Sequence, residues 1–195
     1  LMKLLDNNPY SFITQASERE IQNIQPFVHR TFNSQDLIGF IRSLQIIYKN
    51  KGGLQPIFEK SYLKTGDIKQ SLIYFRKLFI QNCTENRTLK HIADVEKGSS
   101  AKRLNMFLRW MVRKDANGVD FGLWTGIPMH ALYIPLDVHV GNIARGLEIL
   151  KRGQNDWKSV EELTSVLRTF DPNDPVKYDY ALFGIGVFEK NKKNI

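Results

Sequence analysis

The residues with the clearest chemical potential lie in two segments, 96–103 and 134–140. In the first segment a Gly/Ser-rich turn opens a helix, and four long side chains share one narrow stripe of that helix. The stripe consists of Lys102, Met106, Arg109 and Arg113. It predicts a cationic ridge beside helix-start N–H groups that could meet a phosphate. The alternative is an ordinary surface helix whose charges are solvated.

In the second segment, Asp137 precedes an amphipathic helix whose apolar positions are Ile143, Ala144, Leu147 and Leu150. An aspartate at this position can cap the helix, since its carboxylate accepts hydrogen bonds from the exposed N–H groups of the first turn. The functional alternative is a carboxylate at the mouth of a cleft, held there by the helix start and ionised near neutral pH. The sequence favours the cap, and both interpretations stay open at this point.

Helical periodicity runs through almost the whole chain and predicts an all-α fold. No run of alternating apolar and polar residues is long enough for a sheet, and the sequence has no internal repeat and no linker. One helix is expected to begin at Ser34 and to end at the Gly52-Gly53 turn, and a second is expected to begin at Asp67, in a capping box with Gln70. A third is expected to begin at Asn155 or Asp156 and to end before Asp171. A fourth is expected to begin at Asp174, which is followed by Pro175 at the first helical position.

The composition favours a polyanionic partner. The 195 residues carry a net charge of +8, which suits nucleic acid or an anionic membrane surface. No apolar run approaches the roughly 18 residues needed to cross a bilayer, so we expect a cytoplasmic protein. The single cysteine, Cys83, excludes a disulfide framework, a Cys-rich zinc site and a Cys-ligated iron–sulfur cluster. His29, His91 and His130 lack ligand spacing, so we expect no metal centre.

The two segments together resemble the helix-hairpin-helix superfamily of base-excision DNA glycosylases, and most closely its 8-oxoguanine glycosylase branch. In those enzymes a lysine opens the helix after the hairpin, and an aspartate follows in a Val-Pro-Val-Asp-x-His-type segment. The turn 98–102 matches the first feature loosely, and a close match to the second is Ile134-Pro135-Leu136-Asp137-Val138-His139-Val140, followed by Ile143-Ala144-Arg145. In the late helix, Asp179 and Phe183 have the spacing of a polar and an aromatic residue that line the base pocket.

The wider pattern, including residues 155–157 and 174–179, is identified as that of a bacterial family of unassigned function within this superfamily. That family covers essentially the whole chain and normally begins upstream of Leu1, so we expect the chain to be truncated at its N-terminus. The resemblance implies a single glycosylase-like unit of two interlocked helical lobes with a cleft between them. One lobe would span about 30–133, with the hairpin-like turn at 93–102, and the other 1–29 plus 134–195.

The resemblance assigns the chemistry to Lys102 and Asp137. The lysine amine would attack C1′ of an extruded nucleotide and form a Schiff base, which permits β-elimination of the 3′ phosphate. The aspartate would stabilise the oxocarbenium-like charge or shuttle protons. Lys97 is the alternative nucleophile, and we prefer Lys102 because it begins the cationic stripe. The implied function is base-excision repair by a DNA glycosylase with AP-lyase activity, on an oxidised purine such as 8-oxoguanine.

The resemblance also implies how damaged double-stranded DNA is held. The expected base-pocket residues are Met106, Trp124, Asp179 and Phe183, with Trp110 as a further stacking candidate. The expected phosphate contacts are Gly98, Ser99, Arg103, Arg109 and His139. Core packing is the alternative for Phe183, and a solvated position in the first helical turn is the alternative for His139. We expect a nucleoid-associated monomer with no membrane partner.

The hairpin departs from the superfamily pattern. The usual Leu-Pro-Gly-x-Gly turn, which holds a DNA phosphate through a cation, is replaced by residues 93–98, where Asp94 and Glu96 would repel a phosphate. A monovalent cation bound at this turn is the one cofactor that the resemblance to these glycosylases allows. The altered hairpin favours a second hypothesis, a DNA-binding module without catalysis, and the presence of both Lys102 and Asp137 argues against it. A third hypothesis is a related enzyme that acts on RNA or on another modified nucleotide.

Overall fold

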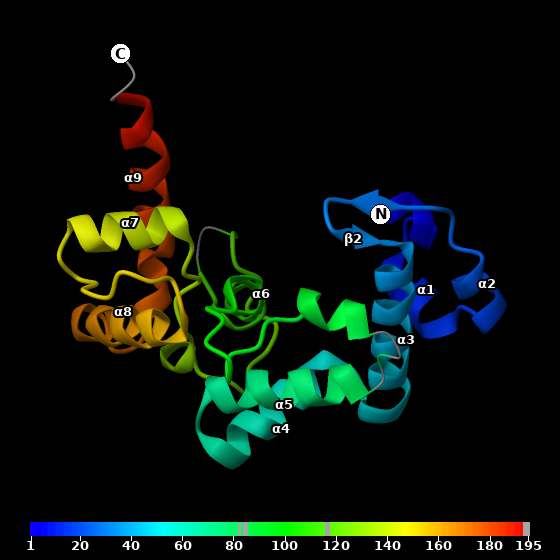
Figure 1. Ribbon diagram of the computed structural model, residues 1–195. Helices are drawn as coiled ribbons and strands as arrows, with labels where there is room; N and C mark the ends of the chain where they lie inside the picture. The colour runs from blue at the N-terminus through cyan, green and yellow to red at the C-terminus, as the bar shows by residue number, and fades with distance from the viewer. Residues whose placement is uncertain (82, 84–85, 116–117, 193–195) are drawn as a thin grey trace. The chain divides into compact units, whose positions relative to one another are not determined.

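The computed structural model describes residues 1–81, 83, 86–115 and 118–192, and this part of the chain is mostly helical (Figure 1). The α-helices are α1 (Pro9–Gln15), α2 (Glu18–Gln22), α3 (Ser34–Lys51), α4 (Leu54–Thr65), α5 (Ile68–Gln81), α6 (Lys102–Val112), α7 (Val138–Gly146), α8 (Trp157–Phe170) and α9 (Asp179–Lys192). Short 3-10 helices are η1 (Met2–Leu5), η2 (Asn86–His91), η3 (Met129–Ala131) and η4 (Pro175–Tyr178).

The all-α prediction is confirmed for the described residues. Their only strands are β1 (Val28–His29) and β2 (Phe32–Asn33), which pair antiparallel as one short hairpin. None of their helices has both the length and the apolar character needed to cross a bilayer.

The chain forms two compact units. Unit 1 contains residues 1–61 and 74–92, and unit 2 contains residues 62–73 and 93–195. This division differs from the two lobes expected from the sequence, because residues 1–29 join the helices that follow them and not the C-terminal part of the chain. The reason is apolar packing: Leu5 and Ile21 form one buried cluster with Leu37 and Ile41 of α3.

Unit 1 extends its core through aromatic contacts that α5 makes with earlier helices. The Phe79 ring lies 4.9 Å from the Phe40 ring, and the Phe75 ring lies 5.1 Å from the Phe58 ring, measured between centroids. These four side chains come from α3, α4 and α5, and the two on α5 are buried. The second half of α5 is therefore an integral part of unit 1.

Unit 2 packs α7 against α9, and the two helices cross each other in Figure 1. The contact is close because Gly186 on α9 leaves room: an added Cβ would lie 3.2 Å from His139 Cβ of α7. The first part of α5 also belongs to this unit. Lys69 donates to Glu161 of α8 at 2.8 Å, and Asp67 accepts from the Tyr133 hydroxyl at 3.3 Å.

Local signals set most helix boundaries as expected. Helix α3 ends at Gly52, whose positive φ of 76° suits a residue without a Cβ atom. Helix α8 begins after Asp156, whose carboxylate accepts from Ser159 N–H, and it ends before Asp171. Helix α5 begins after Asp67 as expected, but the bonds of the expected capping box with Gln70 are replaced: the Asp67 carboxylate accepts from Lys69 N–H at 2.8 Å, and Asp67 N–H donates to the Thr65 hydroxyl at 3.3 Å.

Two further expected caps are corrected by the structure. Asn33 caps α3 in a capping box with Asp36, because the Ser34 hydroxyl instead accepts from Phe27 N–H at 2.6 Å. Asp174 precedes the 3-10 helix η4 and makes no side-chain capping bond there, because its carboxylate accepts from Arg113 at 2.9 Å. In both cases a more distant partner competes for the capping group.

Replacing Trp157 with alanine is expected to lower the free energy of unfolding by about 3–5 kcal/mol, because the side chain is 2% exposed and its loss leaves a large cavity. Chemical denaturation monitored by circular dichroism measures this change. Trp110→Ala is the control: that side chain is 41% exposed, so the expected loss is about 1 kcal/mol or less. Equal losses in the two variants would contradict the assignment of Trp157 to the core.

Candidate functional site

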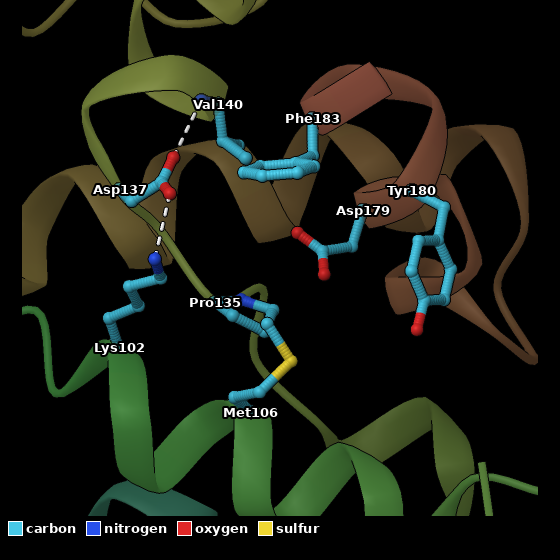
Figure 2. Close-up of a pocket in the computed structure, with 8 residues that line it drawn as sticks. All are labelled: Lys102, Met106, Pro135, Asp137, Val140, Asp179, Tyr180 and Phe183. Carbon is cyan, nitrogen blue, oxygen red and sulfur yellow. Dashed lines mark hydrogen bonds and ion pairs between the residues drawn. The ribbon is translucent and has the colours of Figure 1, made fainter. Parts of the chain in front are cut away.

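The central feature of the site is an ion pair between Lys102, the first residue of α6, and Asp137, the residue before α7. Lys102 Nζ lies 2.8 Å from Asp137 Oδ2 (Figure 2). The other carboxylate oxygen, Oδ1, accepts from Val140 N–H at 2.8 Å and so caps α7. The predicted cap is confirmed, and the same carboxylate also lines a pocket. Asp137 therefore caps α7 and at the same time presents a carboxylate to the pocket.

The turn before α6 is hydrogen-bonded both to the segment that carries Asp137 and to the start of α8. The Ser100 hydroxyl donates to Leu136 O at 3.4 Å, directly before Asp137, and Gly98 O accepts from Trp157 N–H at 2.9 Å. Ala101 is buried in the left-handed region, with φ 47° and ψ 35°, and the helix starts at the next residue. This sharp turn directs the Lys102 side chain towards Asp137.

Lys97, the alternative nucleophile, occupies a different position. Its side chain is exposed, and its backbone N–H donates to Asp94 Oδ1 at 3.2 Å within the turn. Lys97 does not belong to the described residues that line the pocket. The structure therefore brings Lys102 to Asp137 and leaves Lys97 on the outside of the turn.

A pocket of about 170 Å³ lies beside the ion pair. Figure 2 shows Met106 on one side of this space and Phe183 on the other. Phe183 is 42% exposed and meets the His139 ring edge-on, with 5.8 Å between centroids. The residues that line the pocket are Lys102, Met106, Pro135, Asp137, Val140, Asp179, Tyr180 and Phe183. Its walls are thus mainly apolar and aromatic, which suits a planar ring.

Asp179 places a buried carboxyl group at the pocket. Its Oδ2 accepts from Arg109 Nη1, whereas its Oδ1 is buried and has no hydrogen-bond partner among the described residues. Burial raises the pKa of Asp179 to about 6, against the opposing effect of the Arg109 guanidinium. At neutral pH the group is therefore mainly ionised, with one oxygen available to a hydrogen-bond donor.

The Asp137 carboxyl group is perturbed in the opposite direction. Burial alone would raise its pKa, but hydrogen bonds from Lys102 and from Val140 N–H overcome that effect and hold the pKa below its usual value. The site thus contains two carboxyl groups whose environments shift their pKa values apart. Such a difference is typical of groups with distinct chemical roles.

The cationic ridge expected along α6 is not formed. Arg109 is fully buried, where it pairs with Asp120 and Asp179, so its guanidinium is not available to a phosphate. Arg113 pairs with Asp120 at 2.8 Å and with two other aspartates, Asp115 and Asp174. These aspartates lie outside α6, so the spacing of residues along that helix does not predict that they meet its arginines. Arg103 on the same helix is exposed.

Two expected DNA contacts, those of the Gly98 and Ser99 backbone N–H groups with a phosphate, are corrected. The backbone N–H groups of Gly98 and Ser99 already donate to Val95 O at 3.1 Å and to Asp94 O at 2.9 Å, so they are not free for a phosphate. His139 is half-buried, and its Nδ1 is buried without a hydrogen-bond partner in the described part of the chain.

Trp124 does not line the pocket as expected. It is 6% exposed, and its ring meets the Phe107 ring edge-on at 5.4 Å, so it packs in the interior of unit 2. Trp110 is partly exposed and also lies outside the residues that line the pocket. The expected pocket residues Met106, Asp179 and Phe183 are brought together.

Sequence reasoning missed three pocket-lining residues and one buried acid. Pro135 and Val140 flank Asp137 in the chain, and Tyr180 follows Asp179, so proximity in the sequence was an available signal. Asp120 had no such signal, because it lies between helices and reaches Arg109 only through the fold. In the described residues, no three His, Cys, Asp or Glu side chains are grouped as metal ligands.

The comparisons with known proteins give one match. The family described as a protein of unknown function (DUF2400) matches residues 1–188, which is nearly the whole chain. Neither the curated proteins nor the solved structures contain a match.

Proposed function

Because the chain belongs to the DUF2400 family of proteins of unknown function, we propose a function from the site itself: a DNA glycosylase with AP-lyase activity. The proposed substrate is an oxidised purine such as 8-oxoguanine in duplex DNA. The observation that carries the proposal is the 2.8 Å contact of Lys102 Nζ with Asp137 Oδ2 beside a pocket that suits a planar ring. A nucleophile and its carboxylate partner thus lie together where a base would enter.

In the proposed reaction, the Lys102 ammonium first gives a proton to Asp137 across their 2.8 Å contact, and the neutral amine then attacks C1′ of the damaged nucleotide. A bond forms from Nζ to C1′, the glycosidic bond breaks, and its electron pair leaves with the base, which takes up a proton. That proton comes from the protonated Asp137, and the carboxylate so regenerated takes up the proton that Nζ loses after the attack, as the contact of Oδ2 with Nζ permits. Opening of the sugar ring gives the Schiff base, and loss of a C2′ proton then eliminates the 3′ phosphate.

The pocket would receive the extruded base. Phe183 and Met106 provide opposite apolar surfaces for the ring, and base–aromatic stacking contributes about 1–3 kcal/mol per base. The free Oδ1 of Asp179 would accept a hydrogen bond from an N–H group of the purine. Oxidation at C8 of guanine converts N7 from an acceptor into an N–H donor, so an acceptor here favours the damaged base.

DNA contacts outside the pocket are part of the same proposal. Exposed Arg103 on α6 is available to a phosphate, and His139 lies at the first turn of α7 beside Phe183. A monovalent cation at the turn 93–98 would offset the acids Asp94 and Glu96 there. The proposed enzyme acts as a monomer on double-stranded DNA in the nucleoid.

Borohydride trapping tests the proposed function. The wild-type chain is incubated with duplexes that contain 8-oxoguanine or an abasic site, and with an undamaged duplex as the control. The expected result is a covalent protein–DNA adduct with both damaged duplexes and none with the control, because borohydride reduces a Schiff base to a stable amine. Salt-sensitive duplex binding without any adduct would reject the lyase and leave the non-catalytic DNA-binding module as the better hypothesis.

A further inference from the structure

Behind the pocket wall, a buried arginine connects two distant parts of unit 2. Arg109 Nε donates to Asp120 Oδ2 at 3.2 Å, and its Nη1 donates to Asp179 Oδ2. The guanidinium also lies over the ring of Tyr180, with Cζ 4.0 Å from the ring centroid. Asp179 and Tyr180 both line the pocket, whereas Arg109 and Asp120 do not.

The contacts of Arg109 fix which oxygen of Asp179 meets a ligand. Because Oδ2 is bound by Arg109, Oδ1 remains as the free acceptor, and Figure 2 shows the carboxyl group pointing into the space between Phe183 and Met106. The planar guanidinium holds this geometry through directed N–H groups, which an ammonium group cannot reproduce.

Asp120 in turn holds Arg109. It lies in the segment between α6 and η3, and its Oδ2 accepts from both Arg109 and Arg113. This second arginine also pairs with Asp174, so Asp120 is bound to the body of the unit from two sides. The position of the Arg109 side chain therefore depends on a residue of the connecting segment.

From these contacts, and resting on the proposed function, we propose that Arg109 and Asp120 are positioning residues that keep Asp179 ionised and aimed into the pocket as a hydrogen-bond acceptor. Together they determine which bases the pocket accepts: those that present an N–H donor to Asp179. Neither residue touches the base in this proposal; both act through Asp179.

The charged groups around Asp179 define the expected direction of each substitution. Arg109 faces it from α6 and lowers its pKa, as does Lys102, whereas Asp137 before α7 raises it. The remaining groups nearby are His139 of α7, Tyr180 of α9, and Asp120 with Arg113 behind Arg109. Removing Arg109 therefore raises the pKa of Asp179, whereas removing the charge of Asp120 leaves Arg109 less neutralised and lowers it.

The test measures the titration of Asp179 directly, by carbon-13 NMR of protein labelled at its aspartate carboxyl groups, with Asp179→Asn to assign the signal. Arg109→Gln is expected to raise the midpoint by about one pH unit or more, from a wild-type value near 6. Asp120→Asn is expected to lower it. Arg109→Lys, which restores the charge without the planar geometry, is expected to return the midpoint most of the way towards the wild-type value.

Arg168→Gln is the matched control. Arg168 also lies over a tyrosine ring, 5.1 Å from the centroid of Tyr133, and it donates to His130 O, but it contacts no pocket-lining residue in the described part of the chain. Its loss is expected to leave the midpoint unchanged. A midpoint that stays constant in Arg109→Gln, or that moves the same way in Arg109→Gln and Asp120→Asn, would overturn the proposal.

A second readout separates this inference from the proposed function. If the wild-type chain forms the trapped adduct, the acid limb of its pH–rate profile on 8-oxoguanine duplex is expected to move with the NMR midpoint in each variant. If no adduct forms, opposite shifts of the midpoint still support the positioning role, and only the glycosylase proposal fails. A pH–rate profile that stays fixed while the midpoint moves would overturn the role of Asp179 as the acceptor.

Discussion

Lys102→Gln is expected to abolish the borohydride-trapped adduct on both the 8-oxoguanine and the abasic-site duplex. The amide of glutamine cannot form a Schiff base, whereas Lys102 Nζ lies 2.8 Å from Asp137 at the pocket. The measurement is the yield of covalent complex on a denaturing gel, at equal protein concentrations. The fold is expected to persist, because the Lys102 side chain is 43% exposed and its removal leaves no large cavity.

Lys97→Gln provides the matched control, since this lysine lies five residues earlier in the turn that precedes α6. Its exposed side chain lies outside the residues that line the pocket, so trapping is expected to continue at the wild-type yield. Trapping that survives in Lys102→Gln and disappears in Lys97→Gln would keep the reaction class and transfer the nucleophile to Lys97. Trapping in both single variants would show that another amine reacts.

Asp137→Asn is expected to reduce base excision by about 10²–10⁴-fold while the fold remains intact, because a proton-transferring carboxylate contributes about that much to rate. Asparagine keeps the shape of the side chain, and its amide oxygen can still cap α7 by accepting from Val140 N–H. It loses the negative charge that pairs with Lys102. Single-turnover excision and thermal unfolding, measured on the same preparation, separate the two effects.

Asp156→Asn is the control for the cap. Asp156 caps α8 in the same manner, by accepting from Ser159 N–H at 3.1 Å, and it pairs with Arg152 on the surface. This variant is expected to keep wild-type excision, since Asp156 does not line the pocket. If Asp137→Asn lost only stability, or if both variants lost excision equally, Asp137 would be a structural cap without a role in the chemistry.

Helix boundaries could be predicted where the deciding contact is local. Gly52 ends α3 and Asp156 begins α8 because a positive φ and a side-chain cap depend on residues at most three positions away. The capping roles expected for Ser34 and Asp174 are not formed, since each side chain binds a partner from an earlier part of the chain, Phe27 and Arg113 respectively. The same distinction explains the division into units, which depends on packing between α1, α2 and α3 that periodicity does not encode.

In the candidate site, too, the features expressed in short segments could be predicted, and those that depend on distant parts of the chain could not. The pairing of Lys102 with Asp137 was expected from the resemblance of two short segments, and the structure brings these residues together. The burial of Arg109 was not predictable, because spacing on α6 gives the direction of a side chain but not the charge of what it meets. Asp120 and Asp179 approach that arginine from 11 and 70 residues away.

The two-part composition of unit 2 has a practical consequence for dissecting the protein: no single cut in the chain yields the pocket on an independent fragment. A fragment that begins at residue 93 lacks Lys69 and Asp67, and so leaves Glu161 and the Tyr133 hydroxyl without these partners. A fragment that begins at residue 62 retains both, but it also carries Phe75 and Phe79 without Phe58 and Phe40. Such exposed aromatic side chains favour aggregation. Fragment libraries and proteolytic trimming are therefore expected to return the whole chain as the smallest well-behaved species.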